Sequence, residues 1–211
     1  MSITDQLSSR INQHSDQANI DLAEQIANEG NMKAVSELAE GLEAKDAALQ
    51  SDCVKTLYEI GKRRPELIAP YASLFLKLLR SRNNRMVWGG MMALETIAEI
   101  QADQIFPEAG FIQKTIQKGS TITRDAGIGT MAGVARARAE YNRALMPFLL
   151  EHVRTCRPAS VPQHAEKVFT AINSDTAPDF LSILRQRLPD LTPSQTKRVQ
   201  KMIKTLEKDS H

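Results

Sequence analysis

The strongest constraint on the fold is an internal repeat with a step of 37 residues. When the chain is slid against itself by this step, four segments fall into register, and each has apolar residues at three-residue spacing. The matching residues are Val54, Leu57 and Ile60; Met91, Leu94 and Ile97; Ile128, Met131 and Val134; Ala165, Val168 and Ala171. A two-helix unit cannot bury such a stripe alone, so neighbouring units must stack. The sequence therefore predicts an all-α, right-handed α-α superhelix, a solenoid of about five antiparallel helix pairs.

The other helix of each pair obeys the same step, and the step also sets the domain organisation. Its apolar residues are Leu38 and Leu42, Phe75 and Leu79, Ile112 and Ile116, and Leu149 and Val153; Pro70 aligns with Pro107. The spacing contracts near the end of the chain, where "LTPSQ" predicts a helix start with Thr192 as N-cap and Gln195 in a capping box. We expect one domain over 1–211, with an N-terminal helical cap (1–29), regular repeats (30–173) and a C-terminal capping pair (174–211).

The second helix of two repeats has the residue pattern of a known family. An aliphatic residue is followed by small residues at four and five positions, a leucine at eight and an aliphatic residue at eleven. These positions are Met86, Gly90, Met91, Leu94 and Ile97 in one copy and Leu49, Cys53, Val54, Leu57 and Ile60 in another; the third copy departs with Thr123. Over residues 15–207 the chain resembles the HEAT-repeat family. The resemblance implies a solenoid whose second helices line its concave wall, and it implies little about function.

Composition and single residues argue against several classes of protein and kinds of site. The chain has 211 residues, 42% hydrophobic and 25% charged, and no apolar run approaches the roughly 18 residues of a spanning helix. Its first residues lack a signal-peptide pattern, so a cytoplasmic location is expected. Cys53 and Cys156 are predicted to be buried small residues without a disulfide. His14, His152, His164 and His211 show no ligand spacing, so neither a metal nor another cofactor is expected.

Two adjacent glycines in "NNRMVWGGMMALETIAEI" need an explanation, because each costs roughly 1 kcal/mol in a helix interior relative to alanine. The residues that align with Gly90 at steps of 37, here called its column, are Cys53, Gly127 and His164. A small residue there lets paired helices approach closely. Gly89 lies one residue off the packing stripe, so the repeat register predicts that it faces outward, and that Gly89→Ala stabilises the fold whereas Gly90→Ala destabilises it.

An outward Gly89 would belong to a shallow trough on the concave wall. Two wall columns run through Lys55, Met92, Gly129 and Glu166 and through Glu59, Thr96, Gly133 and Thr170. The predicted partner-binding residues are Trp88, Gly89, Met92, Ala126, Gly129, Gly133 and Arg136. Two other interpretations remain open: the glycines relieve crowding in a tightly curved wall, and Trp88 is partly buried against the neighbouring repeat.

Charge is unevenly distributed along the chain. Residues 1–60 contain 4 basic and 11 acidic side chains, and residues 61–211 contain 23 and 14. Basic residues recur where one helix of a pair leads to the next, which predicts an anion-binding edge formed by Lys77, Arg80, Arg82, Arg85, Lys118, Arg124, Arg154 and Arg157; Lys114, Arg185 and Arg187 follow the same pattern. The alternative is that these cations only complement helix carboxyl ends and need no ligand.

The function that the sequence favours is a non-enzymatic scaffold that binds a protein or peptide segment in its concave face. An anion-binding or nucleic-acid-binding adaptor that uses the basic edge is the first alternative. A HEAT-like alkylpurine DNA glycosylase is the second, although only Trp88, Asp125 and Arg136 are available for its site. No small-molecule substrate is evident from the sequence, and enzymatic activity stays uncertain.

Overall fold

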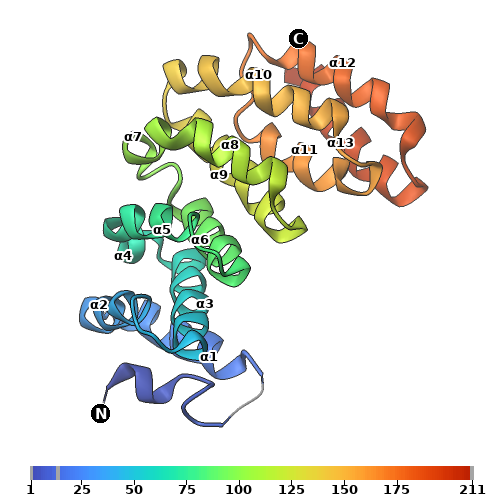
Figure 1. The fold of residues 1–211 in the computed structure, drawn as a ribbon. Helices are drawn as coiled ribbons and strands as arrows, with labels where there is room; N and C mark the ends of the chain where they lie inside the picture. The colour runs from blue at the N-terminus through green and yellow to red at the C-terminus, as the bar shows by residue number, and fades with distance from the viewer. Residues whose placement is uncertain (1, 13–14, 210–211) are drawn as a thin grey trace. The chain divides into compact units, whose positions relative to one another are not determined.

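The fold is entirely helical in the part of the chain that the computed structural model describes, residues 2–12 and 15–209 (Figure 1). His14 and His211, considered above as possible ligands, lie outside the described residues. The chain forms two compact units, Met1–Thr130 and Met131–His211, each of which is described by itself below. Within the described ranges, no helix combines the length and apolar character that crossing a bilayer requires. The all-α prediction is confirmed.

The helices alternate along the chain as the first and the second helix of each predicted pair. The first positions are held by α2 (Met32–Gly41), α5 (Ala72–Leu78), α8 (Ala109–Lys118), α10 (Ala139–Thr155) and α12 (Ala177–Arg187). The second positions are held by α3 (Ala47–Arg63), α6 (Asn84–Ile97), α9 (Thr121–Ala137), α11 (Val161–Phe169) and α13 (Pro193–Asp209). A short 3-10 turn, η1 (Ile3–Gln6), and α1 (Gln17–Glu29) precede them. The division between the two units falls within α9.

Proline breaks the first helix in both middle repeats. Before α5 lie α4 (Pro65–Ile68) and η2 (Ala69–Tyr71), and before α8 lie α7 (Ala102–Ile105) and η3 (Phe106–Glu108). The aligned prolines, Pro70 and Pro107, are the second residues of these 3-10 turns. Because proline lacks a backbone N–H and crowds the preceding turn, the helix cannot continue straight through it. The repeat register of these two prolines is confirmed, and the first helix of each of these repeats is divided into three pieces, a short α-helix, a 3-10 turn and a longer α-helix.

Polar caps explain where several second helices begin. The Asp46 carboxylate accepts from the backbone N–H groups of Ala48 and Leu49 at the start of α3. At the start of α13, the Gln195 side chain accepts from the backbone N–H of Thr192 at 3.0 Å. These bonds satisfy donors that the first turn of a helix leaves unpaired. The helix start predicted from "LTPSQ" is therefore confirmed.

The predicted apolar stripe forms the core of both units. Leu57 and Leu94 are fully buried in the first unit, and Met131 is buried in the second. In the first unit α3 packs against α1, α2, α4 and α6, and Figure 1 shows α1 and α2 beside α3. In the second unit α10 packs against α11 and α12, and α11 packs against α13. The predicted repeat register thus places equivalent residues in equivalent buried positions.

Leu94→Ala tests this register. The side chain is 0% exposed, so its truncation leaves a cavity and is expected to reduce the free energy of unfolding by about 2 to 5 kcal/mol. Urea unfolding followed by circular dichroism measures the change. Ile100→Ala, at a side chain that is 54% exposed, is the matched control and should change stability little. A loss below about 0.5 kcal/mol at Leu94 would mean that the register is wrong.

Candidate functional site

The structure explains Gly90 and Gly127 as predicted. A Cβ atom at Gly90 would lie 2.8 Å from the Leu78 Cβ and 3.0 Å from the carbonyl oxygen of Phe75. A Cβ at Gly127 would collide with the side chain of Ile116. Both contacts are with the first helix of the same repeat, so the small column does allow paired helices to approach closely.

The prediction that Gly89 faces outward is wrong. Gly89 is buried, and a Cβ there would lie 2.8 Å from both methyl carbons of Val54. Val54 belongs to α3, the second helix of the preceding repeat, and α3 and α6 pack directly on one another. A second helix therefore has two packing faces, one toward its paired first helix and one toward the preceding second helix. The repeat register of one helix identifies only the first of these faces.

Other residues of the predicted trough are also partly covered. Trp88 is half-buried, and its ring centroid lies 6.2 Å from that of Tyr58. Ala126 is buried, and a Cβ at Gly129 would collide with the Glu95 carboxylate. Met92 and Gly133 are half-buried and Arg136 is exposed; Gly133 and Arg136 belong to the second unit. The trough as a binding site stays a prediction, but Gly89 and Ala126 do not form its exposed wall.

Lys55 and Glu59 were predicted to line the wall, and this is also wrong. Both side chains are buried, because α1 packs along α3. Lys55 donates to Glu59 at 2.9 Å, and Lys62 donates to the same carboxylate at 2.8 Å. Burial raises the pKa of Glu59, but the hydrogen bonds from Lys62 and Lys55 outweigh it and lower the pKa from 4.5 to about 2. This cluster is thus an internal ion network of the first unit.

Most cations of the predicted basic edge have partners within the protein. Their ion pairs are Lys77 with Glu43 (2.7 Å), Arg80 with Glu108 (2.9 Å), Arg85 with Asp16 (3.6 Å) and Arg154 with Glu151 (2.6 Å). Arg124 donates to the carbonyl groups of Ile116 and Gly119 at the end of α8, and Arg157 donates to Ser160. Arg124 thus fits the helix-end interpretation. Arg82 and Lys118 are exposed, and the described residues supply neither with an ion pair.

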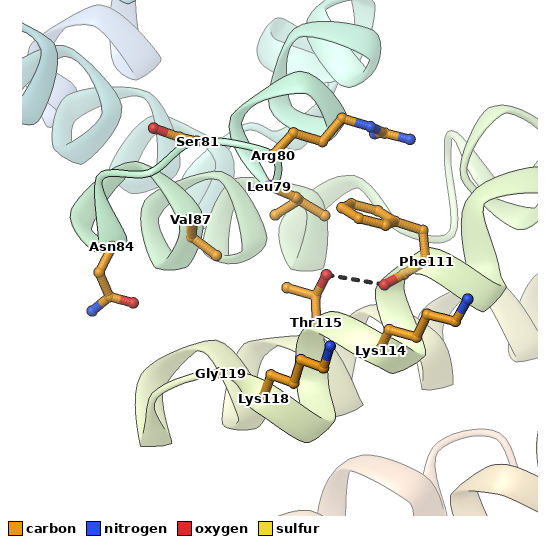
Figure 2. Close-up of a pocket in the computed structure, with 10 residues that line it drawn as sticks. All are labelled: Leu79, Arg80, Ser81, Asn84, Val87, Phe111, Lys114, Thr115, Lys118 and Gly119. Atoms are coloured by element: carbon orange, nitrogen blue, oxygen red, sulfur yellow. Dashed lines mark hydrogen bonds between the residues drawn. The ribbon is translucent and has the colours of Figure 1, made fainter.

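A groove of about 490 Å³ lies on this edge within the first unit, and we call it the downstream groove (Figure 2). It is lined by Leu79, Arg80, Ser81, Asn84, Val87, Phe111, Lys114, Thr115, Lys118 and Gly119. Figure 2 shows Leu79 and Phe111 facing one another, with Lys114 and Lys118 projecting from α8. The Arg80 guanidinium lies over the Phe111 ring, 4.1 Å from its centroid. The groove therefore combines an apolar floor with three cations.

A second groove of about 530 Å³, the upstream groove, is lined by Leu42, Glu43, Gln50, Leu74, Lys77, Leu78, Arg80 and Ser81. Seven of these residues have an equivalent 37 positions later that lines the downstream groove. The equivalent pairs are Leu42 and Leu79, Glu43 and Arg80, Gln50 and Val87, Leu74 and Phe111, Lys77 and Lys114, Leu78 and Thr115, and Ser81 and Lys118. The two grooves are therefore the same feature of the repeat, formed twice.

The two grooves differ in charge at equivalent positions. In the upstream groove Glu43 pairs with Lys77. One repeat later these positions are Arg80 and Lys114, and the acidic partner has been replaced by a cation. Arg80 pairs with Glu108, whereas the described residues provide no acidic partner for Lys114. The downstream groove thus lacks the carboxylate that its upstream equivalent contains.

The sequence analysis assigned Arg80 and Lys118 to the edge but missed the groove between them. Leu79, Val87 and Phe111 were considered only as parts of helix patterns, or not at all. The available signal was the 37-residue alignment of Glu43 with Arg80 and of Lys77 with Lys114. It identifies a change of charge, but it does not show that the positions lie around one depression.

Comparisons with known proteins identify the fold. No protein-family model and no curated protein matches this chain. A designed armadillo repeat protein in complex with the peptide (KR)4 is similar at a TM-score of 0.70 and 16% identity, covering 97% of this chain and 98% of that one. A computationally designed armadillo repeat protein for modular peptide recognition has a TM-score of 0.63 and 18% identity, covering 96% and 97%. An engineered protein has a TM-score of 0.67 and 15% identity, covering 99% and 98%. The chain is therefore an all-helical repeat solenoid.

Gly89→Ala is now expected to destabilise the fold by about 1 kcal/mol, because the crowding against Val54 exceeds the gain in helix propensity. Gly110→Ala is the matched control. A Cβ at Gly110, in α8, meets nothing within 4 Å, so this change should stabilise the protein by up to about 1 kcal/mol. Urea unfolding of both variants decides the matter. Equal stabilisation by both changes would show that α3 and α6 are not tightly packed at Gly89.

The Glu59 network predicts a pH dependence of stability. The pKa of Glu59 is lowered in the folded protein, so its contribution is complete above about pH 4.5 and is lost as the pH falls toward 2. Glu59→Gln should therefore lose less stability than the unaltered protein over this interval. Urea unfolding at several pH values measures the difference. Exposed Glu140→Gln controls for the loss of one negative charge, and an unchanged pH profile for Glu59→Gln would contradict the assignment.

Proposed function

We propose that this protein is a non-enzymatic helical-repeat scaffold that binds an acidic peptide segment of a partner protein, with the downstream groove as its main contact. The resemblance to HEAT repeats and the structural similarity to designed armadillo repeat proteins both support a repeat surface suited to binding. The proposal retains three expectations from the sequence: a cytoplasmic location, one solenoid domain, and a HEAT-like origin of the repeat pattern.

The observation that carries the proposal is the missing carboxylate in the downstream groove. Upstream, Glu43 occupies the groove and pairs with Lys77 at 2.7 Å. Downstream, Arg80 takes the position of Glu43, and Lys114 and Lys118 have no acidic partner among the described residues. A glutamate or aspartate of a bound segment would restore the ion pair that the other copy makes internally.

The apolar floor supports a peptide as the partner. Leu79, Val87 and Phe111 offer contact to an aliphatic or aromatic side chain beside the cations. One of the structurally similar designed proteins binds (KR)4, a basic peptide. The downstream groove has the opposite charge, so the peptide proposed here is acidic.

A phosphate-bearing partner is the second candidate, because the same cations suit a nucleic-acid backbone. Figure 2 shows Phe111 as the one aromatic ring among the labelled lining residues, and Arg80 lies over it. Stacking of bases on aromatic rings is therefore limited here. The geometry favours the acidic peptide, and the experiment below distinguishes the two.

The test uses a short fluorescent peptide containing glutamate and leucine. Fluorescence polarisation should show saturable binding that weakens with added salt, and replacement of its glutamates by glutamine should abolish binding. Lys114→Glu together with Lys118→Glu should weaken binding about tenfold, because two exposed ion pairs become repulsive.

Lys201→Glu together with Lys204→Glu is the matched control, because it makes the same charge change on exposed residues of α13. This control should bind the peptide normally. Equal weakening by both double variants would indicate only long-range electrostatics. If single-stranded RNA of similar length binds and the peptide does not, the nucleic-acid alternative replaces the proposal.

A further inference from the structure

Three side chains with metal-ligating atoms gather in the second unit. His152 lies in the last turn of α10, and four residues further Cys156 caps the helix and donates its backbone N–H to the His152 carbonyl at 2.8 Å, so the two residues lie one turn apart. Cys156 directly follows the last residue of α10, and His164 faces the pair from α11. The ligand atoms of all three residues lie within 4.8 Å of one another. The sequence analysis missed this cluster because His164 belongs to a different helix.

The distances are close to those of a metal site. The His152 Nε2 and His164 Nδ1 atoms are 2.9 Å apart and share a hydrogen bond. In a tetrahedral zinc site two ligand nitrogens lie about 3.3 Å apart, and a nitrogen and a sulfur about 3.6 Å apart. The nitrogens would have to separate by a few tenths of an ångström and the sulfur to approach, which rotation of the side chains can provide.

The backbone that presents these ligands is held in place. Arg187, a buried residue of α12, donates to the carbonyl groups of Val153, Arg154 and Cys156 at 2.7 to 2.8 Å. These bonds secure the last turn of α10, which carries Cys156. His164 is 0% exposed, so its ring is restrained by packing. Supported ligands of this kind lose little freedom when an ion binds.

Two arginines lie near the Cys156 thiol. Arg187 and Arg157 both act on it electrostatically, and the Arg187 guanidinium also pairs with Asp190 at 2.9 Å. Burial raises the pKa of the Cys156 thiol, although Arg187 opposes this effect. The thiol is therefore protonated at neutral pH, which disfavours a role as a free nucleophile paired with histidine.

We propose that His152, Cys156 and His164 bind a divalent transition-metal ion of the zinc class, which links α10 to α11. Imidazole nitrogens and thiolates are usual ligands of such an ion, and water completes the fourth position. On binding, the Cys156 thiol releases one proton to solvent. The proton shared by the two histidines moves to the remote nitrogen of its ring, so that both facing nitrogens offer lone pairs.

Cobalt(II) titration of the chelator-treated full chain tests the proposal. We expect one ion per chain, a near-ultraviolet charge-transfer band from the thiolate, and intense visible bands typical of tetrahedral cobalt. Added zinc should displace the cobalt, remove these bands and raise the melting temperature of the protein. Absence of saturable binding would overturn the proposal and leave a hydrogen-bonded histidine pair beside a cysteine.

Cys156→Ser should remove the charge-transfer band, weaken cobalt binding at least tenfold and abolish the zinc-induced rise in melting temperature. Cys53→Ser is the matched control, because Cys53 lies in the first unit and is the other cysteine of the chain. His152→Gln, at a half-buried position, should weaken binding similarly. Far-ultraviolet circular dichroism verifies that each variant is folded. Unchanged cobalt spectra in Cys156→Ser would show that the ion binds elsewhere and would overturn the proposal.

Discussion

The first unit depends on how closely its second helices can approach one another and their paired first helices. Gly89 meets Val54 of α3, and the neighbouring Gly90 meets Leu78 of α5. In return, Gly61 of α3 faces Thr96 of α6, where any side chain would collide. These glycines weaken helix propensity, yet they leave room for the atoms of the neighbouring helix at the points where the helices pack most closely. The adjacent pair is explained by two different packing faces of one helix.

The close packing of helices recurs with the 37-residue repeat. Equivalent residues of successive repeats therefore surround equivalent grooves. The scaffold requires only that the apolar positions repeat, and the exposed positions can differ at little cost to stability. At the groove, Glu43 and Lys77 of one copy become Arg80 and Lys114 of the next. The packing is thus periodic, whereas the charge is not. Binding is proposed at the downstream groove, where the charge differs from that of the preceding copy.

Much of the fold could be predicted from local pattern, because burial of a helix face and the missing N–H of proline act wherever the residue stands. Leu57, Leu94, Pro70 and Pro107 show this. The site was less predictable. Lys55 and Glu59 were placed on an exposed wall by the repeat register, but α1 covers them and they pair with one another. A side chain's partner comes from another element, and the repeat step says nothing about that element.

The sequence by itself determined the helical class, the repeat length and the buried stripe, because these follow from the spacing of apolar residues along one helix. Only the tertiary structure decided which face Gly89 presents, which cations pair with acidic residues among the described residues, and that His164 meets His152 and Cys156. These outcomes depend on distances between atoms that are far apart in the chain. Such distances are set by how whole helices pack, and no local pattern records them.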